Sequence, residues 1–139
     1  MSKVKTSELT DGALDWAVCI AKGMKPEDIY IQKWGRLPAS LFRRLRDEDG
    51  NLDGTYITGP DLLFSRKWEA GGPIIDDEDI AVGHGNSKED PDHKFSASKL
   101  RIHPWPIEAR GPTKLIAAMR CFVASRLGDE VEIPEELLK

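Results

Sequence analysis

The sequence predicts an α+β fold in which a small, mostly antiparallel sheet packs against two main helices, one N-terminal and one C-terminal. Residues 10–22 and 112–127 each place apolar side chains on one side at helical spacing. Between them lie short apolar stretches separated by glycine, proline and acidic turns, which is typical of strands. At 139 residues, the chain is long enough for one core. We therefore expect a single domain over residues 1–139.

The composition indicates an ordinary globular protein, with 40% hydrophobic and 32% charged residues and a net charge of −4. This charge balance argues against a dedicated nucleic-acid binder, although Arg43, Arg44 and Arg46 could form a local basic patch. The N-terminus has no long apolar run, so we expect no signal peptide, no membrane span and a cytoplasmic location.

Each predicted helix has recognisable end signals. Thr10 can cap the first helix and Gly23 can end it, with Asp11, Asp15, Cys19 and Lys22 on its polar side. In the second helix, Pro112 suits the first position and Gly128 suits the position just beyond the end. We expect the acidic tail to dock through Ile133 and Pro134.

The central part of the chain is less regular. Residues 37–46 are ambiguous, because Leu41, Phe42 and Leu45 have helical spacing. Two glycines and a proline within residues 68–75 predict a turn that starts a strand of a hairpin. A mobile surface loop is expected over residues 83–98. Strands are expected at residues 28–34, 56–57, 62–64, 80–82, 100–102 and 105–109, the last of them at a sheet edge.

No catalytic constellation stands out in the sequence. It contains no nucleophile elbow, no HExxH helix and no P-loop, so we assign no catalytic residue and no cofactor. Cys19 and Cys121 both fall in predicted helices, where a reduced, buried thiol explains each better than a nucleophile.

Two groups of residues raise the question of metal binding. Asp49, Asn51, Asp53 and Gly54 have the spacing of a calcium loop, but the twelfth position is Pro60, and Asp61 comes one residue late. A polar turn is the favoured interpretation. The other group comprises the histidines and acids of a predicted loop, with a third histidine further along, and matches no named ligand spacing. Its members are His84, Asp90, Asp92, His93 and His103. We assign no metal site.

Five residues are candidates for ligand binding: Trp68, Gly71, Gly72, Arg120 and Arg126. Trp68 could stack on a ring while the two glycines allow a close approach, although a buried tryptophan beside a turn is the simpler interpretation. Arg120 lies at the border of the apolar face of the C-terminal helix, and Arg126 lies within it. Each could meet an anionic ligand, but a structural ion pair is favoured.

Three stretches resemble the NinX-like family of small phage proteins of unknown function. They include Leu14-Asp15-Trp16-Ala17-Val18, then Trp68-x-x-Gly71-Gly72-Pro73-Ile74-Ile75, and then Gly111-Pro112-Thr113-x-Leu115-Ile116-Ala117-Ala118-Met119-Arg120-Cys121. The resemblance implies a phage or prophage accessory protein that works inside the bacterial host. It supplies no catalytic residues. Residues 35–54 and 83–98 look like insertions relative to shorter members.

Three functions remain open. The first is a non-enzymatic binder of a host or phage protein, and the second is a counter-defence protein that binds a small, nucleotide-type signal. The third is a divalent-metal-dependent enzyme, which we favour least. A homo-oligomer is compatible with each of them.

Overall fold

The computed structural model describes residues 2–32, 35, 40–57, 62–84, 94–99 and 107–138. Its three α-helices are α1 (Asp11–Ala21), α2 (Trp68–Asp77) and α3 (Lys114–Leu127). Short 3-10 helices include η1 (Thr6–Glu8), η2 (Pro26–Asp28) and η5 (Glu135–Leu137). The strands are β1 (Ser2–Lys5), β2 (Ile29–Gln32), β3 (Ser40–Arg46), β4 (Leu52–Ile57), β5 (Ala81–His84), β6 (Phe95–Lys99), β7 (Ile107–Gly111) and β8 (Glu130–Ile133).

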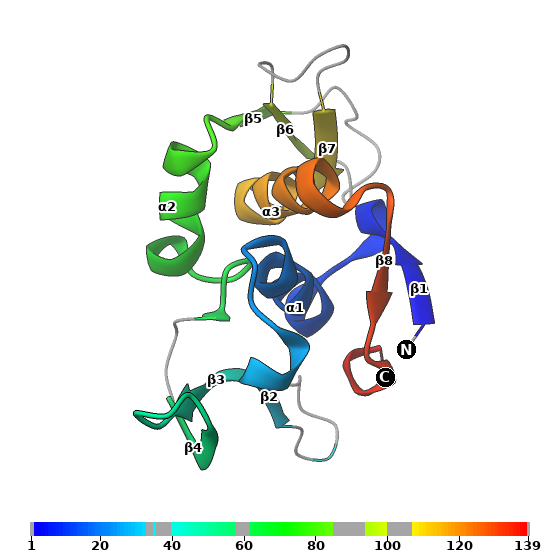
Figure 1. Cartoon of the computed structure of the whole chain (residues 1–139). Coiled ribbons are helices and arrows are strands. Elements are labelled where there is room, and N and C mark those ends of the chain that lie inside the picture. The colour runs from blue at the N-terminus through cyan, green and yellow to red at the C-terminus, as the bar shows by residue number, and fades with distance from the viewer. Residues whose placement is uncertain are drawn as a thin grey trace.

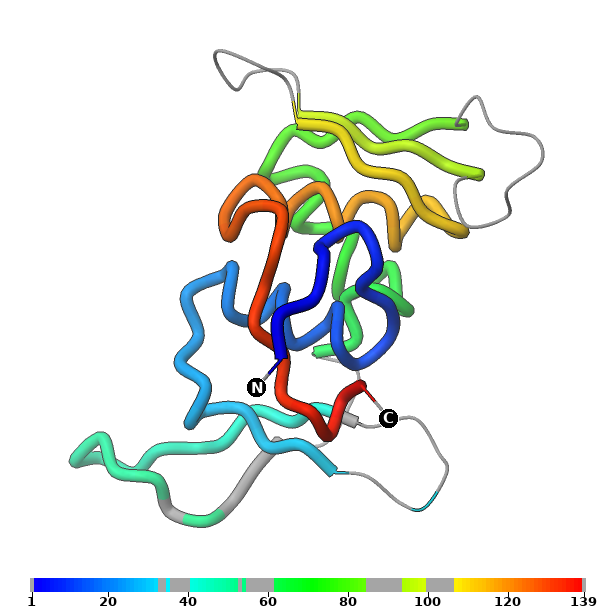
Figure 2. The backbone as a smooth tube through the Cα atoms, turned by 90° about the vertical axis from the view of Figure 1, so that its right-hand side faces the viewer, coloured from blue at the N-terminus to red at the C-terminus, as the bar shows by residue number. Residues whose placement is uncertain are grey.

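The strands form three separate antiparallel sheets within the described residues: β1-β8, β2-β3-β4 and β5-β6-β7. Helices α1 and α3 lie in the middle of the molecule (Figure 1). The β5-β6-β7 sheet covers α3 on one side, and the β2-β3-β4 sheet lies beyond α1 on the other (Figure 2). The α+β class is confirmed, with α2 as a third helix and three small sheets in place of one.

Helix α3 has the predicted end signals, shifted by two residues at its start. The Thr113 side chain caps it by accepting a hydrogen bond from the Ile116 N–H at 3.0 Å, so Pro112 precedes the helix instead of occupying its first position. Gly128 ends it with φ 89°. Every residue from 115 to 123 is buried, because β6, β7 and α1 all pack on this helix.

Helix α1 agrees with the prediction in extent but not in its exposed side. Gly23 follows it with φ 96°, whereas Thr10 makes no side-chain capping hydrogen bond. Asp15 and Cys19 were predicted on the polar side, but both are fully buried. The reason lies in the tertiary structure, because β3 and the segment that contains Ser65 cover that side of the helix.

The prediction for residues 68–75 was wrong, since they belong to α2. Gly71 and Ile74, three positions apart, are both buried on the side of this helix that faces the core. Pro73 lies inside the helix. Glycine and proline weigh against a helix in isolation, and packing overrides that preference here.

Other differences concern strands. Residues 40–46 form β3 despite their helical spacing, because β3 is hydrogen-bonded on both sides, to β2 and to β4. Residues 62–64 form no strand, although Leu62 and Phe64 are buried.

The loop prediction for residues 83–98 was wrong at both ends, where His84 pairs with Phe95 between β5 and β6. Residues 85–93 and the expected strand at 100–102 lie outside the described residues. An edge position was predicted for residues 105–109, and within the described sheet β7 is an edge strand, while residues 105 and 106 lie outside the described residues.

Candidate functional site

Arg120 is the buried charge of α3, with only 1% of its surface exposed. Its Nε donates to the carbonyl oxygen of Leu9 at 2.8 Å, and its Nη1 donates to that of Arg110, also at 2.8 Å. One guanidinium therefore links the segment before α1 to strand β7 across α3. The sequence placed Arg120 only at the border of the apolar face, because a helical projection does not show that β7 and the N-terminal segment meet over this side.

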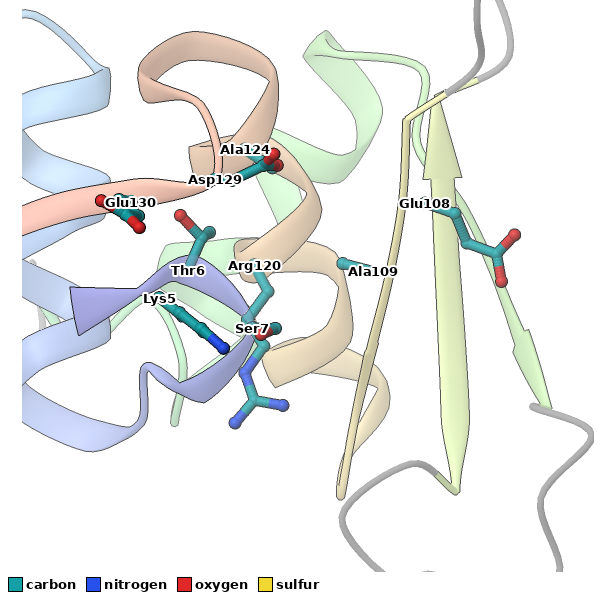
Figure 3. Close-up of a pocket in the computed structure, with 9 residues that line it drawn as sticks. All are labelled: Lys5, Thr6, Ser7, Glu108, Ala109, Arg120, Ala124, Asp129 and Glu130. Carbon is teal, nitrogen blue, oxygen red and sulfur yellow. The ribbon is translucent and has the colours of Figure 1, made fainter.

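Arg120 also lines a pocket of about 230 Å³ between η1, β7, α3 and the start of β8 (Figure 3). The Lys5 side chain points toward Arg120 and Ser7, whereas the Glu108 carboxylate points away from them (Figure 3). The Thr6 hydroxyl donates to the Gly128 carbonyl oxygen at 2.7 Å and closes one side. The full lining is Lys5, Thr6, Ser7, Glu108, Ala109, Arg120, Ala124, Asp129 and Glu130. The lining carries both positively and negatively charged side chains, so its charge favours neither an anionic nor a cationic ligand.

Arg126 lies on a different side of α3, and half of its side chain is exposed. Its guanidinium donates to one carboxylate oxygen of Glu78, and the Lys99 ammonium pairs with the other at 3.1 Å. The ion-pair interpretation of Arg126 is confirmed. The triad of Arg126, Glu78 and Lys99 joins the end of α2 to β6 and α3. Arg126 and Glu78 also line a pocket of about 210 Å³ between α1, α2 and α3.

The triad sets the pH response of Glu78. Burial raises the pKa of this carboxyl, but the hydrogen bonds and charges of Arg126 and Lys99 outweigh burial and lower it below the usual value of 4.5. Because the pKa of Glu78 is lower in the folded than in the unfolded protein, its ionised carboxylate stabilises the fold at pH values above the unfolded-state pKa. That stabilisation is lost as the pH falls through the folded-state pKa.

We expect Glu78→Gln to destabilise the protein at pH 7 and to cost progressively less below about pH 4.5, the usual pKa of the group. At low pH the wild-type carboxyl is itself protonated, so the two chains should converge. Urea unfolding of both chains at pH 7, 5, 4 and 3 measures this. A difference in unfolding free energy that stays constant over that range would show that the ion pairs contribute nothing specific.

Trp68, Gly71 and Gly72 lie on α2, away from Arg120. A Cβ at Gly71 would stand 2.3 Å from the Phe64 carbonyl oxygen and 2.6 Å from Leu115 Cδ1, so this glycine serves helix packing. At Gly72 the nearest atom to such a Cβ is in the Trp68 ring, at 3.9 Å. The Trp68 side chain itself is exposed, with 56% of its surface accessible. The five candidate residues thus occupy three separate places instead of one site.

A buried acid in α1 was missed by the sequence analysis. Asp15 is fully buried and accepts hydrogen bonds from the Ser65 N–H at 2.7 Å and from Arg66 Nη2 at 2.9 Å. Burial raises the pKa of this carboxyl, while Ser65 and Arg66 oppose the rise. No spacing rule connects Asp15 with Arg66, because the contact depends on how the segment after β4 folds back over α1.

Both thiols are buried and protonated. Burial raises the pKa of Cys19 to about 12 and that of Cys121 to about 11. The two cysteines form no disulfide. Since the thiolate is the nucleophilic form, neither side chain is suited to covalent catalysis at neutral pH.

The calcium-like segment spans the hairpin turn between β3 and β4 and the start of β4, which contains Asp53 and Gly54. The Asp47 carboxylate accepts hydrogen bonds from the N–H groups of Asp49 at 3.0 Å and Asn51 at 2.9 Å, and Gly50 has φ 83°. These contacts support the polar-turn interpretation. Over the described part of the chain, no three histidine, cysteine or acidic side chains group as metal ligands would. Of the predicted loop group, His84 packs against Phe95, and Asp90, Asp92, His93 and His103 lie outside the described residues.

The expected basic patch is largely occupied by local contacts. Arg46 pairs with Asp28 at 2.6 Å, and the Arg44 guanidinium stands over the Tyr30 ring at 5.1 Å. Arg43 is exposed.

A family model matches most of the chain. The family model described as Bacteriophage P22, NinX covers residues 5–126, a span that includes α1, α2 and almost all of α3. The search of curated proteins finds no match. No helix in the described ranges is long and apolar enough to cross a membrane. The match covers most of the chain and agrees with the three resembling stretches, so the chain belongs to the phage P22 NinX family.

Proposed function

We propose that this protein is a phage accessory protein that acts in the host cytoplasm by binding a host or phage protein. Its contact surface is the outer side of α2 around Trp68. The observation that carries this proposal is a tryptophan with 56% of its surface exposed on a helix that is fixed to the core. Tryptophan is among the residues most enriched at the energetic centres of protein interfaces.

The rigidity of α2 supports the proposal. Gly71 lets this helix approach the Phe64 carbonyl and the Leu115 side chain closely, and Ile74 is buried beside it. At its C-terminal end, Glu78 connects the helix to Arg126 and Lys99. A side chain presented from a fixed helix loses little conformational freedom on binding, which favours affinity.

The surroundings of Trp68 indicate the kind of partner. Glu69, Pro73, Asp76 and Asp77 are exposed along α2, and Gly72 carries no side chain to cover the neighbouring indole. An aromatic anchor within an acidic rim suits a partner surface that offers an apolar pocket bordered by lysine or arginine.

The competing functions receive less support. A small-molecule site at Trp68 and Arg120 would need these residues to converge, yet the pocket that Arg120 lines includes neither Trp68 nor the two glycines. Two nitrogens of Arg120 already donate to backbone carbonyl groups. We therefore place the protein-binding function first.

Comparative affinity capture from infected cells tests the proposal. Wild-type protein, Trp68→Ala and Leu52→Ala serve as baits, and the bound proteins are quantified by mass spectrometry. Leu52 is the matched control, because it is an apolar side chain with 40% of its surface exposed on β4. We expect one enriched protein that Leu52→Ala retains and Trp68→Ala loses by tenfold or more, about 1.4 kcal/mol.

Two results would count against the proposal. One is the recovery of the same protein in equal amounts by all three baits, which would place its contact elsewhere. The other is that the wild-type bait enriches no protein.

A further inference from the structure

A groove lies between strand β2 and the 3-10 helix η5 near the C-terminus. The two segments lie near one another in Figure 2. The volume of the groove is about 340 Å³. The residues that line it are Trp16, Pro26, Ile29, Ile31, Pro134, Glu135 and Glu136. This groove shares no residue with the α2 surface around Trp68, and the inference from it stands independently of the proposed function.

The floor of the groove is apolar. Trp16 is 4% exposed and Ile29 is 5% exposed, while Ile31 is half-buried and packs against the core. Ile29 and Ile31 are two positions apart on β2, so their side chains are on the same face of the strand. An apolar floor with this spacing accommodates alternate side chains of an extended segment.

Strand β2 offers a backbone edge beside this floor. In the described sheet it pairs with β3 on one side only, because the strand order is β2-β3-β4. The backbone N–H and C=O groups on the other side of an edge strand can pair with an added strand. Such addition supplies affinity through the main chain and specificity through the alternate side chains.

The rim of the groove carries negative charge. Glu135 and Glu136 belong to its lining, and exposed Glu27 lies in η2, just before β2 begins. An acidic rim attracts lysine or arginine and disfavours an acidic ligand. This charge complementarity selects among the extended segments that the floor and the strand edge would otherwise accept.

We propose that this groove binds an extended segment of a partner protein, with apolar and basic residues in alternation, by strand addition to β2. The apolar side chains contact Ile29, Ile31 and Trp16. The basic side chains reach the carboxylate group of Glu135.

A fluorescein-labelled hexapeptide of alternating valine and lysine is the probe. Its comparison peptide has the same sequence with N-methyl groups at alternate backbone nitrogens, which keeps the side chains and charges but removes the donors needed for strand addition. The full-length protein is titrated by fluorescence anisotropy. We expect the probe to bind and the N-methylated peptide to bind at least tenfold more weakly.

Two charge reversals on the protein complete the test. Glu135→Lys alters the groove, while Glu48→Lys makes the same charge change at an exposed turn residue outside the groove. We expect Glu135→Lys to weaken binding at least fivefold and Glu48→Lys to change it less than twofold, with amide shifts in an NMR spectrum centred on residues 29–32. Circular dichroism of both variants verifies that they fold.

Three results would overturn the proposal: no binding of the probe, equal binding of the N-methylated peptide, or equal weakening by the two charge reversals. Equal binding of the N-methylated peptide would exclude strand addition. Equal weakening by the two charge reversals would show attraction to the net negative charge alone.

Discussion

Arg120→Met should lower the free energy of unfolding by about 3–5 kcal/mol, a large share of the stability of a domain this size. Methionine keeps much of the length of the side chain but has no donor. The carbonyl oxygens of Leu9 and Arg110 then lose their donor from this guanidinium within a buried region. Charge-assisted hydrogen bonds contribute about 1.5–3 kcal/mol each, and two are lost together.

Arg126→Met is the matched control on the same helix. Half of the Arg126 side chain is exposed and its ion pair faces solvent, so its loss should cost less than about 1 kcal/mol. The loss of unfolding free energy for Arg120→Lys should fall between the losses for the two methionine variants, because an ammonium group can reach one carbonyl but not both. Urea unfolding followed by circular dichroism gives all three values. Equal losses for the methionine variants at positions 120 and 126 would contradict the assigned role of Arg120.

Gly71→Ala should be the second largest effect, at about 2–3 kcal/mol of destabilisation. The added Cβ would stand 2.3 Å from the Phe64 carbonyl oxygen and 2.6 Å from Leu115 Cδ1. The first of these atoms belongs to the backbone and cannot rotate away. The helix must therefore move outward from α3, which loosens the packing of Ile74.

Gly72→Ala tests the same substitution without the clash, since its nearest neighbour would be the Trp68 ring at 3.9 Å. In a helix, alanine is favoured over glycine by about 1 kcal/mol, so this variant should be as stable as the wild type or slightly more stable. Thermal and urea unfolding of the two variants measure the contrast. Similar stabilities for both would show that α2 does not pack as closely as the structure has it.

Much of the fold could be predicted where local signals and packing agree. Helix α3 follows from its apolar periodicity and from Gly128, and the end of α1 follows from Gly23. Helix α2 could not be predicted, because Gly71 and Pro73 suit a turn when tertiary contacts are unknown. Gly71 is required by the close contact with Phe64, which depends on two distant segments meeting.

The candidate site was predictable only in part. The sequence directed attention to both arginines of α3, but it placed Arg126 within the apolar face and Arg120 at its border. In the structure Arg120 is buried and Arg126 is exposed, since β7 and the segment before α1 cover one side of the helix. Asp15 escaped prediction for the same physical reason: its partner Arg66 approaches from a segment with no local connection to α1.

The most direct test of the central claim is the affinity of the captured partner, once purified, for wild-type protein, Trp68→Ala and Leu52→Ala, measured by isothermal titration calorimetry. If the α2 surface is the contact, Trp68→Ala should raise the dissociation constant by about 30-fold, roughly 2 kcal/mol. The dissociation constant of Leu52→Ala should stay within threefold of the wild-type value. Equal affinities for Trp68→Ala and wild type would contradict a binding surface centred on Trp68.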